Sequence, residues 1–186
     1  MNQPVKIIVI ADTHVKSARE LPRSVVEAID SADMIIHLGD FGGAGVFSDL
    51  ARTGRLKAVS GNHDGSSVRK SLKEKDIIEV NGKKLGLIHG CGCYTPFGIR
   101  SKLMKRFKGE EVDAVLFGHM HVADNQKIGN IVFFNPGSTA NKFPSPRASY
   151  GVITIDDSIH TEICYLDDSP HPADLRFVRQ YIANHL

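Results

Sequence analysis

The sequence predicts an α/β fold in which two β-sheets pack face to face and helices cover the outside. Several Ile- and Val-rich segments lack polar alternation, as do strands that are buried on both faces. In the first half these segments alternate with helical patterns, which is typical of parallel strands. In the second half, strand-like segments are joined by short turns that are typical of β-hairpins.

The first half contains three expected strands and two expected helices. Val5 to Ala11 is a continuous β-branched run, and Ser17 to Asp30 has apolar residues at helical spacing. A second strand is expected from Asp33 to Leu38, a short helix from Val46 to Arg52, and a third strand from Leu56 to Val59. This β-α-β-α-β order predicts a parallel core.

The second half contains three expected hairpins, and Asn81-Gly82 is the clearest turn signal among them. Between the first two hairpins we expect a helix from Ile99 to Phe107 and a buried strand from Ala114 to Phe117. Asn135 to Pro146 is a long, turn-rich loop. The hairpins pair Asp76–Val80 with Lys84–Ile88, Val122–Ile128 with Ile131–Phe134, and Gly151–Ile155 with Ile159–Tyr165.

The length of 186 residues suits a single domain spanning residues 1–186. Its last part, at about 170–186, predicts a helical tail, because apolar residues share one face from Pro172 to Leu186. That helix can dock on the body of the protein or on another subunit, which would make a homo-oligomer.

Composition narrows the class of protein. Hydrophobic residues make up 41% of the chain and charged residues 24%, as in soluble globular proteins. The net charge of +2 gives no strong nucleic-acid signal, and no apolar stretch approaches membrane-spanning length. The basic cluster from Lys102 to Lys108 is interpreted as the solvated face of a helix. Three cysteines, an odd number, indicate reduced thiols and a cytoplasmic location.

Five short clusters of metal-ligand residues appear in order along the chain, most of them after a predicted strand. In open α/β sheets, ligands bind at the carboxyl ends of the strands. Seven such ligands exceed the need of one metal and suggest two adjacent cations, hence hydrolytic phosphate chemistry. The clusters are Asp12-Thr13-His14, Gly39-Asp40, Gly61-Asn62-His63-Asp64, His89-Gly90 and Gly118-His119-Met120-His121.

Chemistry can be assigned to several of these residues. Asp12 and His14, two apart, would project to the same side of extended backbone, and His119 and His121 repeat this arrangement. The carboxylate of Asp40 can bridge two metals. Mixed nitrogen and oxygen ligation suits Mn foremost, with Ni, Fe, Zn or Co as alternatives.

His63 adjoins a ligand and can hydrogen-bond to the phosphoryl oxygens or protonate the leaving oxygen, with Asp64 orienting it. His37 lies inside a strand and is interpreted as a hydrogen-bonded core residue. Cys91 and Cys93 are interpreted as pocket-lining loop residues rather than ligands.

Two further groups allow alternative interpretations. The Asn135-Pro136-Gly137-Ser138 loop can present backbone N–H groups to an anion, and Arg147 can bind a phosphate through two hydrogen bonds. Both groups can equally be ordinary turn and surface residues.

Together the five clusters resemble the calcineurin-like metallophosphoesterase superfamily, whose ordered pattern is D-x-H, G-D, G-N-H-D/E, H and G-H-x-H. The resemblance extends from residue 7 to about residue 147. In length and in its loops the chain is most similar to the small bacterial and archaeal phosphodiesterases, which are similar in size to the retromer subunit that shares their fold.

The resemblance implies a four-layer α/β-β/α sandwich of two mixed sheets flanked by helices. It also implies a dinuclear site with Asp40 as the bridge and His63 as the catalytic histidine. A metal-bridging hydroxide would attack the phosphorus of a small phosphodiester, which can be a nucleotide. Asp12, His14 and His121 would bind one metal, and Asn62, His89 and His119 would bind the other.

Two other functions stay open. A non-catalytic scaffold for protein–protein interaction would show eroded ligands or a lost catalytic histidine, and neither is seen. A phosphomonoesterase such as a protein phosphatase would carry an Asp-Arg pair shortly after Gly39-Asp40, but Phe41-Gly42-Gly43 follows here.

Overall fold

The computed structural model describes residues 3–90, 98–140 and 147–166. Cys91, Cys93, residues 141–146 of the predicted long loop and the predicted C-terminal helix lie outside the described residues. The elements in order are β1 (Val5–Ile10), η1 (Ala18–Glu20), α1 (Arg23–Asp30), β2 (Met34–His37), α2 (Ala44–Ala51), β3 (Leu56–Ala58), α3 (Ser66–Ser71), β4 (Lys75–Val80), β5 (Lys83–Ile88), α4 (Ile99–Arg106), β6 (Ala114–Phe117), β7 (Asp124–Ile128), β8 (Ile131–Asn135), β9 (Ser149–Ile155) and β10 (Ile159–Tyr165).

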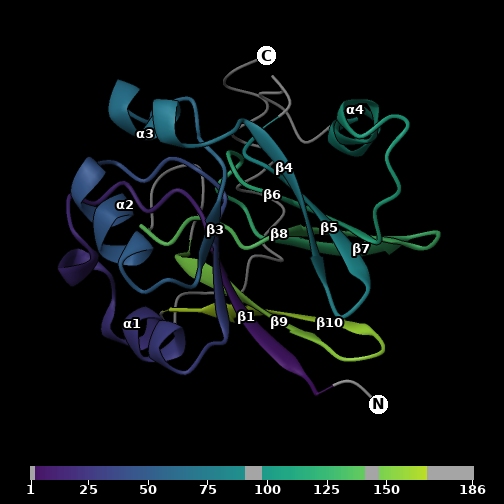
Figure 1. Cartoon of the computed structure of the whole chain (residues 1–186), viewed down its shortest axis with the longest axis horizontal. Coiled ribbons are helices and arrows are strands. Elements are labelled where there is room, and N and C mark those ends of the chain that lie inside the picture. The colour runs from purple at the N-terminus through teal and green to yellow at the C-terminus, as the bar shows by residue number, and fades with distance from the viewer. Residues whose placement is uncertain (1–2, 91–97, 141–146, 167–186) are drawn as a thin grey trace.

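The strands form two mixed five-stranded sheets (Figure 1). The first has the order β10-β9-β1-β2-β3, in which β1, β2 and β3 are parallel, β9 is antiparallel to β1, and β10 is antiparallel to β9. The second has the order β4-β5-β6-β8-β7. All three predicted hairpins are confirmed, but the centre of the second sheet is parallel, because β5, β6 and β8 run the same way. The crossover from β5 to β6 includes α4, which makes the parallel pairing topologically accessible.

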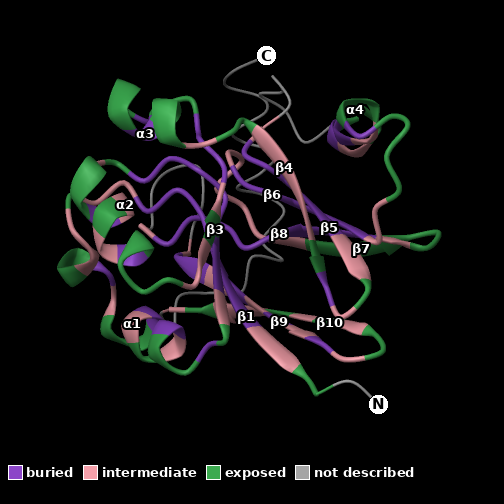
Figure 2. Cartoon of the chain, in the orientation of Figure 1, coloured by how far each residue is buried: buried purple, intermediate pink, exposed green. Residues whose placement is uncertain are grey.

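Three clusters of buried apolar side chains define four layers. One cluster fills the space between the sheets and includes Val9, Leu87 and Phe134. A second joins the outer face of the first sheet to α1, α2 and α3, and a third joins the outer face of the second sheet to α4. The helices bury only their inward faces (Figure 2). The predicted α/β-β/α sandwich is therefore confirmed.

Two local predictions need correction. The helix expected over Ser17–Asp30 is divided into η1 and α1, because Pro22 cannot donate an intrahelical hydrogen bond and holds Leu21 in an extended conformation. The short helix α3 was not predicted. Its sequence has no apolar periodicity, and only Val68 is buried.

None of the described helices is long and apolar enough to cross a lipid bilayer.

Candidate metal centre

The eight predicted site residues lie in loops that follow five strands whose carboxyl ends meet at one edge of the sandwich. Hydrogen bonds join the sheets there, and among them the His89 Nδ1–H donates to the Leu38 carbonyl (2.7 Å) and the His119 N–H donates to Asp12 Oδ2 (3.1 Å). The residues after β1, β2 and β3 are Asp12, His14, Asp40, Asn62 and His63, and those after β5 and β6 are His89, His119 and His121.

Backbone strain is concentrated in these loops. Six non-glycine residues of the described chain have positive φ, and five of them are predicted ligands; the sixth, Asn81, occupies a hairpin turn. Such a conformation costs on the order of 1–3 kcal/mol per residue and is found mainly at functional sites. The five ligands are Asp12 (51°), His14 (49°), Asp40 (57°), His119 (71°) and His121 (57°). The expectation of extended backbone at Asp12–His14 and His119–His121 is therefore wrong.

Two overlapping groups of ligand atoms result. Atoms of Asp12, His14 and His121 all lie within 4.8 Å of one another, and so do atoms of Asp12, Asp40 and His89. The shared residue is Asp12, whereas the family resemblance assigned the bridge to Asp40. The pair His119 and His121 is divided: His121 joins the first group, and the His119 ring lies 5.2 Å from the His89 ring.

The environment of the two carboxylates fits divalent cations. Asp12 Oδ1 and Asp40 Oδ2 are buried and accept no hydrogen bond from the described residues. They face His121 Nε2 at 3.3 Å and His89 Nε2 at 3.4 Å. An unsatisfied buried carboxylate oxygen is costly, and a cation would compensate it. Imidazole nitrogen combined with carboxylate oxygen suits Mn, Fe, Co, Ni or Zn.

The His89 ring is oriented so that its Nε2 atom can bind a metal ion. Since a carbonyl only accepts hydrogen bonds, Nδ1 must carry the proton that it donates to Leu38. Nε2 then faces two oxygen atoms, Asn62 Oδ1 at 3.0 Å and Asp40 Oδ2. A neutral Nε2 cannot donate to either oxygen, so this position requires a proton or a metal ion.

The local charges shift two pKa values in opposite directions. Burial alone would raise the pKa of Asp40, but the close approach of His89 Nε2, the hydrogen bond from the His63 amide and the charges of both rings lower it to about 2. Burial alone would lower the pKa of His89, but its close contact with the Asp40 carboxylate and the charges of Asp12 and Asp40 raise it. Asp40 is thus ionised at neutral pH, and a proton competes with metal at His89.

This competition predicts a pH dependence of metal binding. Because the pKa of His89 is raised above its ordinary value of 6.5, the ring keeps its second proton to higher pH than an ordinary histidine, and this proton must leave when metal binds. The apparent affinity for Mn²⁺ should rise by up to about tenfold per pH unit between about pH 6 and the raised pKa, then flatten. Calorimetric titration at several pH values measures this. An affinity that is independent of pH would contradict His89 as a ligand.

Asp64 was expected to orient His63, but its carboxylate contacts backbone amides instead. Its carboxylate accepts three backbone N–H bonds, from Asp40 (3.1 Å), Phe41 (2.8 Å) and Gly61 (2.7 Å). It therefore fastens the loop after β2 to the loop after β3. These two loops pack so closely that a Cβ atom on Gly61 would lie 2.1 Å from Asp40 Oδ1, so only glycine fits at this position.

Replacing Asp64 should destabilise the protein. Asp64→Ala would leave three N–H groups without their acceptor, at about 1–3 kcal/mol for each that stays buried, so we expect a loss on the order of 3 kcal/mol. Urea denaturation in the presence of EDTA measures this. The control Asp30→Ala removes an exposed carboxylate and should change the free energy of unfolding by less than about 0.5 kcal/mol. Equal stability of the two variants would contradict this role of Asp64.

His63 lies at the rim of the site. Its backbone N–H donates to Asp40 Oδ1 (2.8 Å), so its position is tied to that of the acidic ligand. The residue is exposed, and its ring centroid lies 6.1 Å from that of His14. This placement leaves the imidazole accessible to a molecule bound over the metal ligands.

Other predicted residues have structural roles. His37 is fully buried, contacts Thr13 Oγ1 through Nε2 (3.0 Å), accepts the Gly39 N–H through Nδ1 (3.1 Å) and stacks on Phe41. Burial and the charge of His89 lower the pKa of His37 to about 3. It is therefore a core histidine, as expected.

The Asn135–Ser138 loop is a support rather than an anion cradle. The Gly137 and Ser138 N–H groups donate to Asn135 Oδ1 (2.9 Å) and to the His121 carbonyl (3.1 Å). The Ser138 hydroxyl donates to the Asp12 carbonyl (2.9 Å). The Arg147 guanidinium lies 4.1 Å from the centroid of the Tyr165 ring.

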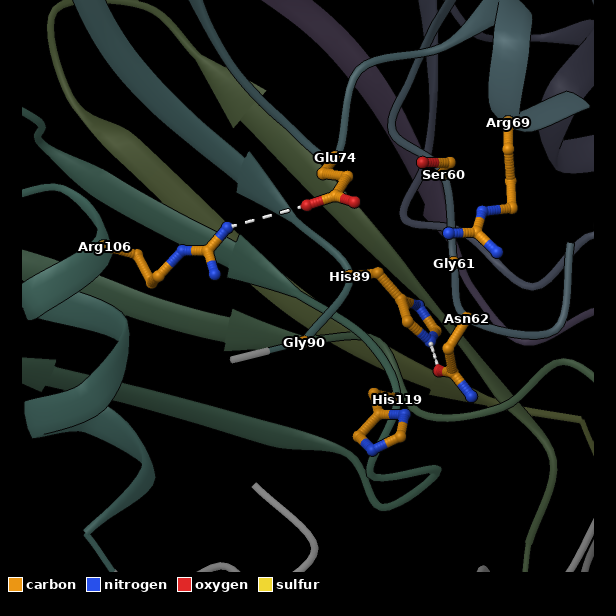
Figure 3. A pocket seen from close by; sticks show the side chains of 9 residues that line it. All are labelled: Ser60, Gly61, Asn62, Arg69, Glu74, His89, Gly90, Arg106 and His119. Atoms are coloured by element: carbon orange, nitrogen blue, oxygen red, sulfur yellow. Dashed lines mark hydrogen bonds and ion pairs between the residues drawn. The ribbon is translucent and has the colours of Figure 1, made fainter. Parts of the chain in front are cut away.

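A cleft of about 240 Å³ opens beside the second ligand group. Its lining includes the ligands Asn62, His89 and His119 and two arginines, Arg69 from α3 and Arg106 from α4 (Figure 3). Sequence reasoning missed both arginines as site residues. The helix α3 was not predicted, and Arg106 was one of several basic residues assigned to a solvated helix face.

Comparison with known proteins identifies the family of the chain. Residues 5–158 match the model of the calcineurin-like phosphoesterase superfamily domain. A probable metallophosphoesterase of Methanocaldococcus jannaschii is 32% identical over 161 residues, covering 86% of this chain and 81% of that protein. A phosphodiesterase of the same organism is 26% identical over 149 residues, covering 72% and 83%.

The fold is also shared with a solved structure of Vps29. The crystal structure of Vps29 from Entamoeba histolytica in complex with Zn²⁺ superposes with a TM-score of 0.67 and 23% identity, covering 87% of this chain and 99% of that chain.

Proposed function

The chain belongs to the calcineurin-like phosphoesterase superfamily, and on that basis we propose that it is a metal-dependent phosphodiesterase with two divalent cations. The observation that carries the proposal is the pair of buried carboxylate oxygens, on Asp12 and Asp40, that accept no hydrogen bond among the described residues and face imidazole nitrogens. The related phosphodiesterase of M. jannaschii supports a diester as the substrate.

We propose that the ligands divide into two sets. Asp12, His14 and His121, which already converge, would hold one cation. Asn62, His89 and His119, which line one cleft, would hold the other. Asp40 would lie between them. Mn²⁺ is our first choice of metal, and Ni²⁺, Fe²⁺, Zn²⁺ or Co²⁺ would tolerate the same donors.

The protein residues would position and protonate the substrate. When bound, two such cations polarise a phosphoryl group and lower the pKa of water, which supplies the attacking hydroxide. The Leu38 carbonyl fixes the orientation of the His89 ring, and the Asp12 carboxylate accepts the backbone N–H of His119, which holds the loop that carries His119 beside Asp12. His63, exposed at the rim, would donate a hydrogen bond to the phosphoryl oxygens or a proton to the leaving oxygen.

We further propose that the protein acts in the cytoplasm on a small phosphodiester, with a nucleotide as one candidate. The support for this location is the cysteine content alone. A single domain of 186 residues and association through its C-terminal helix remain predictions from the sequence.

A direct assay tests the proposal. Protein stripped of metal with EDTA should not hydrolyse bis(4-nitrophenyl) phosphate, and addition of Mn²⁺ or Ni²⁺ should restore hydrolysis. The diester should be hydrolysed at least about tenfold faster than 4-nitrophenyl phosphate, a difference of about 1.4 kcal/mol in activation free energy. Preference for the monoester would instead identify a phosphomonoesterase.

A scaffold function is the second candidate, since Vps29 has the same fold. The strained ligand loops argue against it, because a scaffold has no need for left-handed backbone at five ligand positions. Absence of metal-dependent hydrolysis of both substrates, in a protein that is folded by circular dichroism, would favour the scaffold.

A further inference from the structure

We propose that Arg69 and Arg106 bind a second phosphate of the substrate, so that the preferred substrates are linear phosphodiesters that carry an additional phosphate, such as phosphorylated oligonucleotides. The inference rests on the proposed phosphodiesterase function, and it specifies the substrate class. Its basis is the position of two guanidinium groups in the cleft that contains Asn62, His89 and His119.

The two arginines approach the cleft from different elements. Figure 3 shows Arg69 extending from α3 on one side and Arg106 from the opposite side, with Glu74 between them. The helix α3 begins shortly after Asn62 and His63, so the loop that supplies these residues also places Arg69. A substrate whose reacting phosphate lies at His89 would therefore extend toward both guanidinium groups.

The guanidinium groups are available to an anion. Among the described residues, the Arg69 side chain makes no ion pair and no hydrogen bond, although the residue lines the cleft. Arg106 has only a long contact with Glu74, at 4.0 Å, and both of these side chains are substantially exposed, at 46% and 76%. Exposed pairs of this kind are weak, so a phosphate can displace Glu74. A guanidinium binds phosphate through two parallel hydrogen bonds.

The cleft continues past Arg69. A second depression shares Ser60, Arg69 and Glu74 with the first and adds Ser66 and Lys70. Three basic residues and one acidic residue thus line a path that leads away from the metal ligands. This charge distribution suits an extended polyanion. A cyclic mononucleotide or an aryl diester has a single phosphate, so the basic residues of this path would not increase its affinity.

The test compares two dinucleotides that differ by one phosphate: thymidylyl-thymidine and the same dinucleotide with a phosphate on its 5′ end. Calorimetry with metal-free protein measures binding, and hydrolysis with Mn²⁺ measures KM. Wild type should bind the phosphorylated dinucleotide about tenfold more tightly and show a correspondingly lower KM, which is the gain expected of one charge-assisted contact. The difference should narrow as salt is added.

Variants assign the effect to the two arginines. Arg69→Ala and Arg106→Ala should each reduce the preference to about twofold or less, and Arg69→Lys should retain part of it. Glu74→Gln should increase the preference by removing the competing carboxylate. Lys102→Ala, which removes an exposed charge of α4 away from the cleft, should leave the preference at its wild-type value.

The outcomes separate this inference from the proposed function. Equal binding of the two dinucleotides by wild type, or an undiminished preference in both arginine variants, would overturn the inference even if the aryl diester is hydrolysed. Failure of the proposed function would appear instead as absence of metal-dependent hydrolysis of the aryl diester by wild type.

Discussion

Asp40→Asn should abolish metal-dependent hydrolysis, with an expected loss of about 1,000-fold in kcat/KM, equivalent to about 4 kcal/mol. Asp40 is 1% exposed, and its pKa is lowered to about 2, so it supplies a full negative charge inside the site. The asparagine is nearly the same shape, and its amide oxygen can still accept the hydrogen bond from the His63 N–H. The change therefore removes charge while it preserves the loop.

Thermal unfolding distinguishes this effect from misfolding. In EDTA the variant should be folded but somewhat less stable than wild type, because the lowered pKa of Asp40 means that its charge interactions with His89 and His63 stabilise the folded protein at neutral pH. On addition of Mn²⁺, wild type should gain thermal stability, because a metal ion that binds the folded protein stabilises it. The variant should gain little, because it should bind Mn²⁺ weakly. Asp33→Asn is the matched control, since Asp33 also accepts a backbone N–H, from Lys6, but lies at the amino end of β2, opposite the end that precedes the metal ligands. Wild-type activity in Asp40→Asn would contradict the proposed mechanism.

His63→Ala should lose turnover but still bind metal, whereas Asp40→Asn should lose both. Loss of a general acid typically costs 10²–10⁴-fold in rate, so we expect kcat to fall by about 100-fold or more. The rise in thermal stability with Mn²⁺ should persist, because the His63 side chain is exposed at the rim and belongs to neither group of converging ligand atoms. Steady-state kinetics on the aryl diester, together with thermal unfolding, measures both.

The control for this variant is His160→Ala. His160 is an exposed histidine whose Nε2 lies 3.6 Å from Asp156 Oδ1, on the β9–β10 hairpin. The His160→Ala variant should retain the kcat and KM of wild type. If His63→Ala loses the response to Mn²⁺ instead of turnover, His63 is a metal ligand and its assigned role is wrong.

The position of the site was predictable because it depends on strand order and on polar residues at strand ends. Continuous apolar runs identified β1, β2 and β6, the Asn81-Gly82 turn identified β5, and a carboxylate or imidazole follows each of these strands. Parallel neighbours bring these ends to one edge. The hairpin turn at Asn81-Gly82 was also predictable from the local sequence, since both residues adopt the positive φ that such turns require.

The detailed geometry was not predictable because it depends on contacts between distant segments. Left-handed backbone at Asp12 and His121 is stabilised by bonds such as that from the Ser138 hydroxyl to the Asp12 carbonyl, 126 residues apart. Asp64 was linked in the sequence to its neighbour His63, but its carboxylate binds loop amides 23 and 24 residues away. Arg69 could not be assigned to the site, because no apolar pattern marks the short helix α3 that carries it.

Anomalous scattering from crystals soaked in Mn²⁺ tests the two-metal centre most directly. The prediction is two anomalous peaks about 3.5–4 Å apart, the usual separation in dinuclear sites. One should be bound by Asp12, His14 and His121 and the other by Asn62, His89 and His119, with Asp40 between them. A single peak, or none at a Mn²⁺ concentration that supports full activity, would contradict the dinuclear centre.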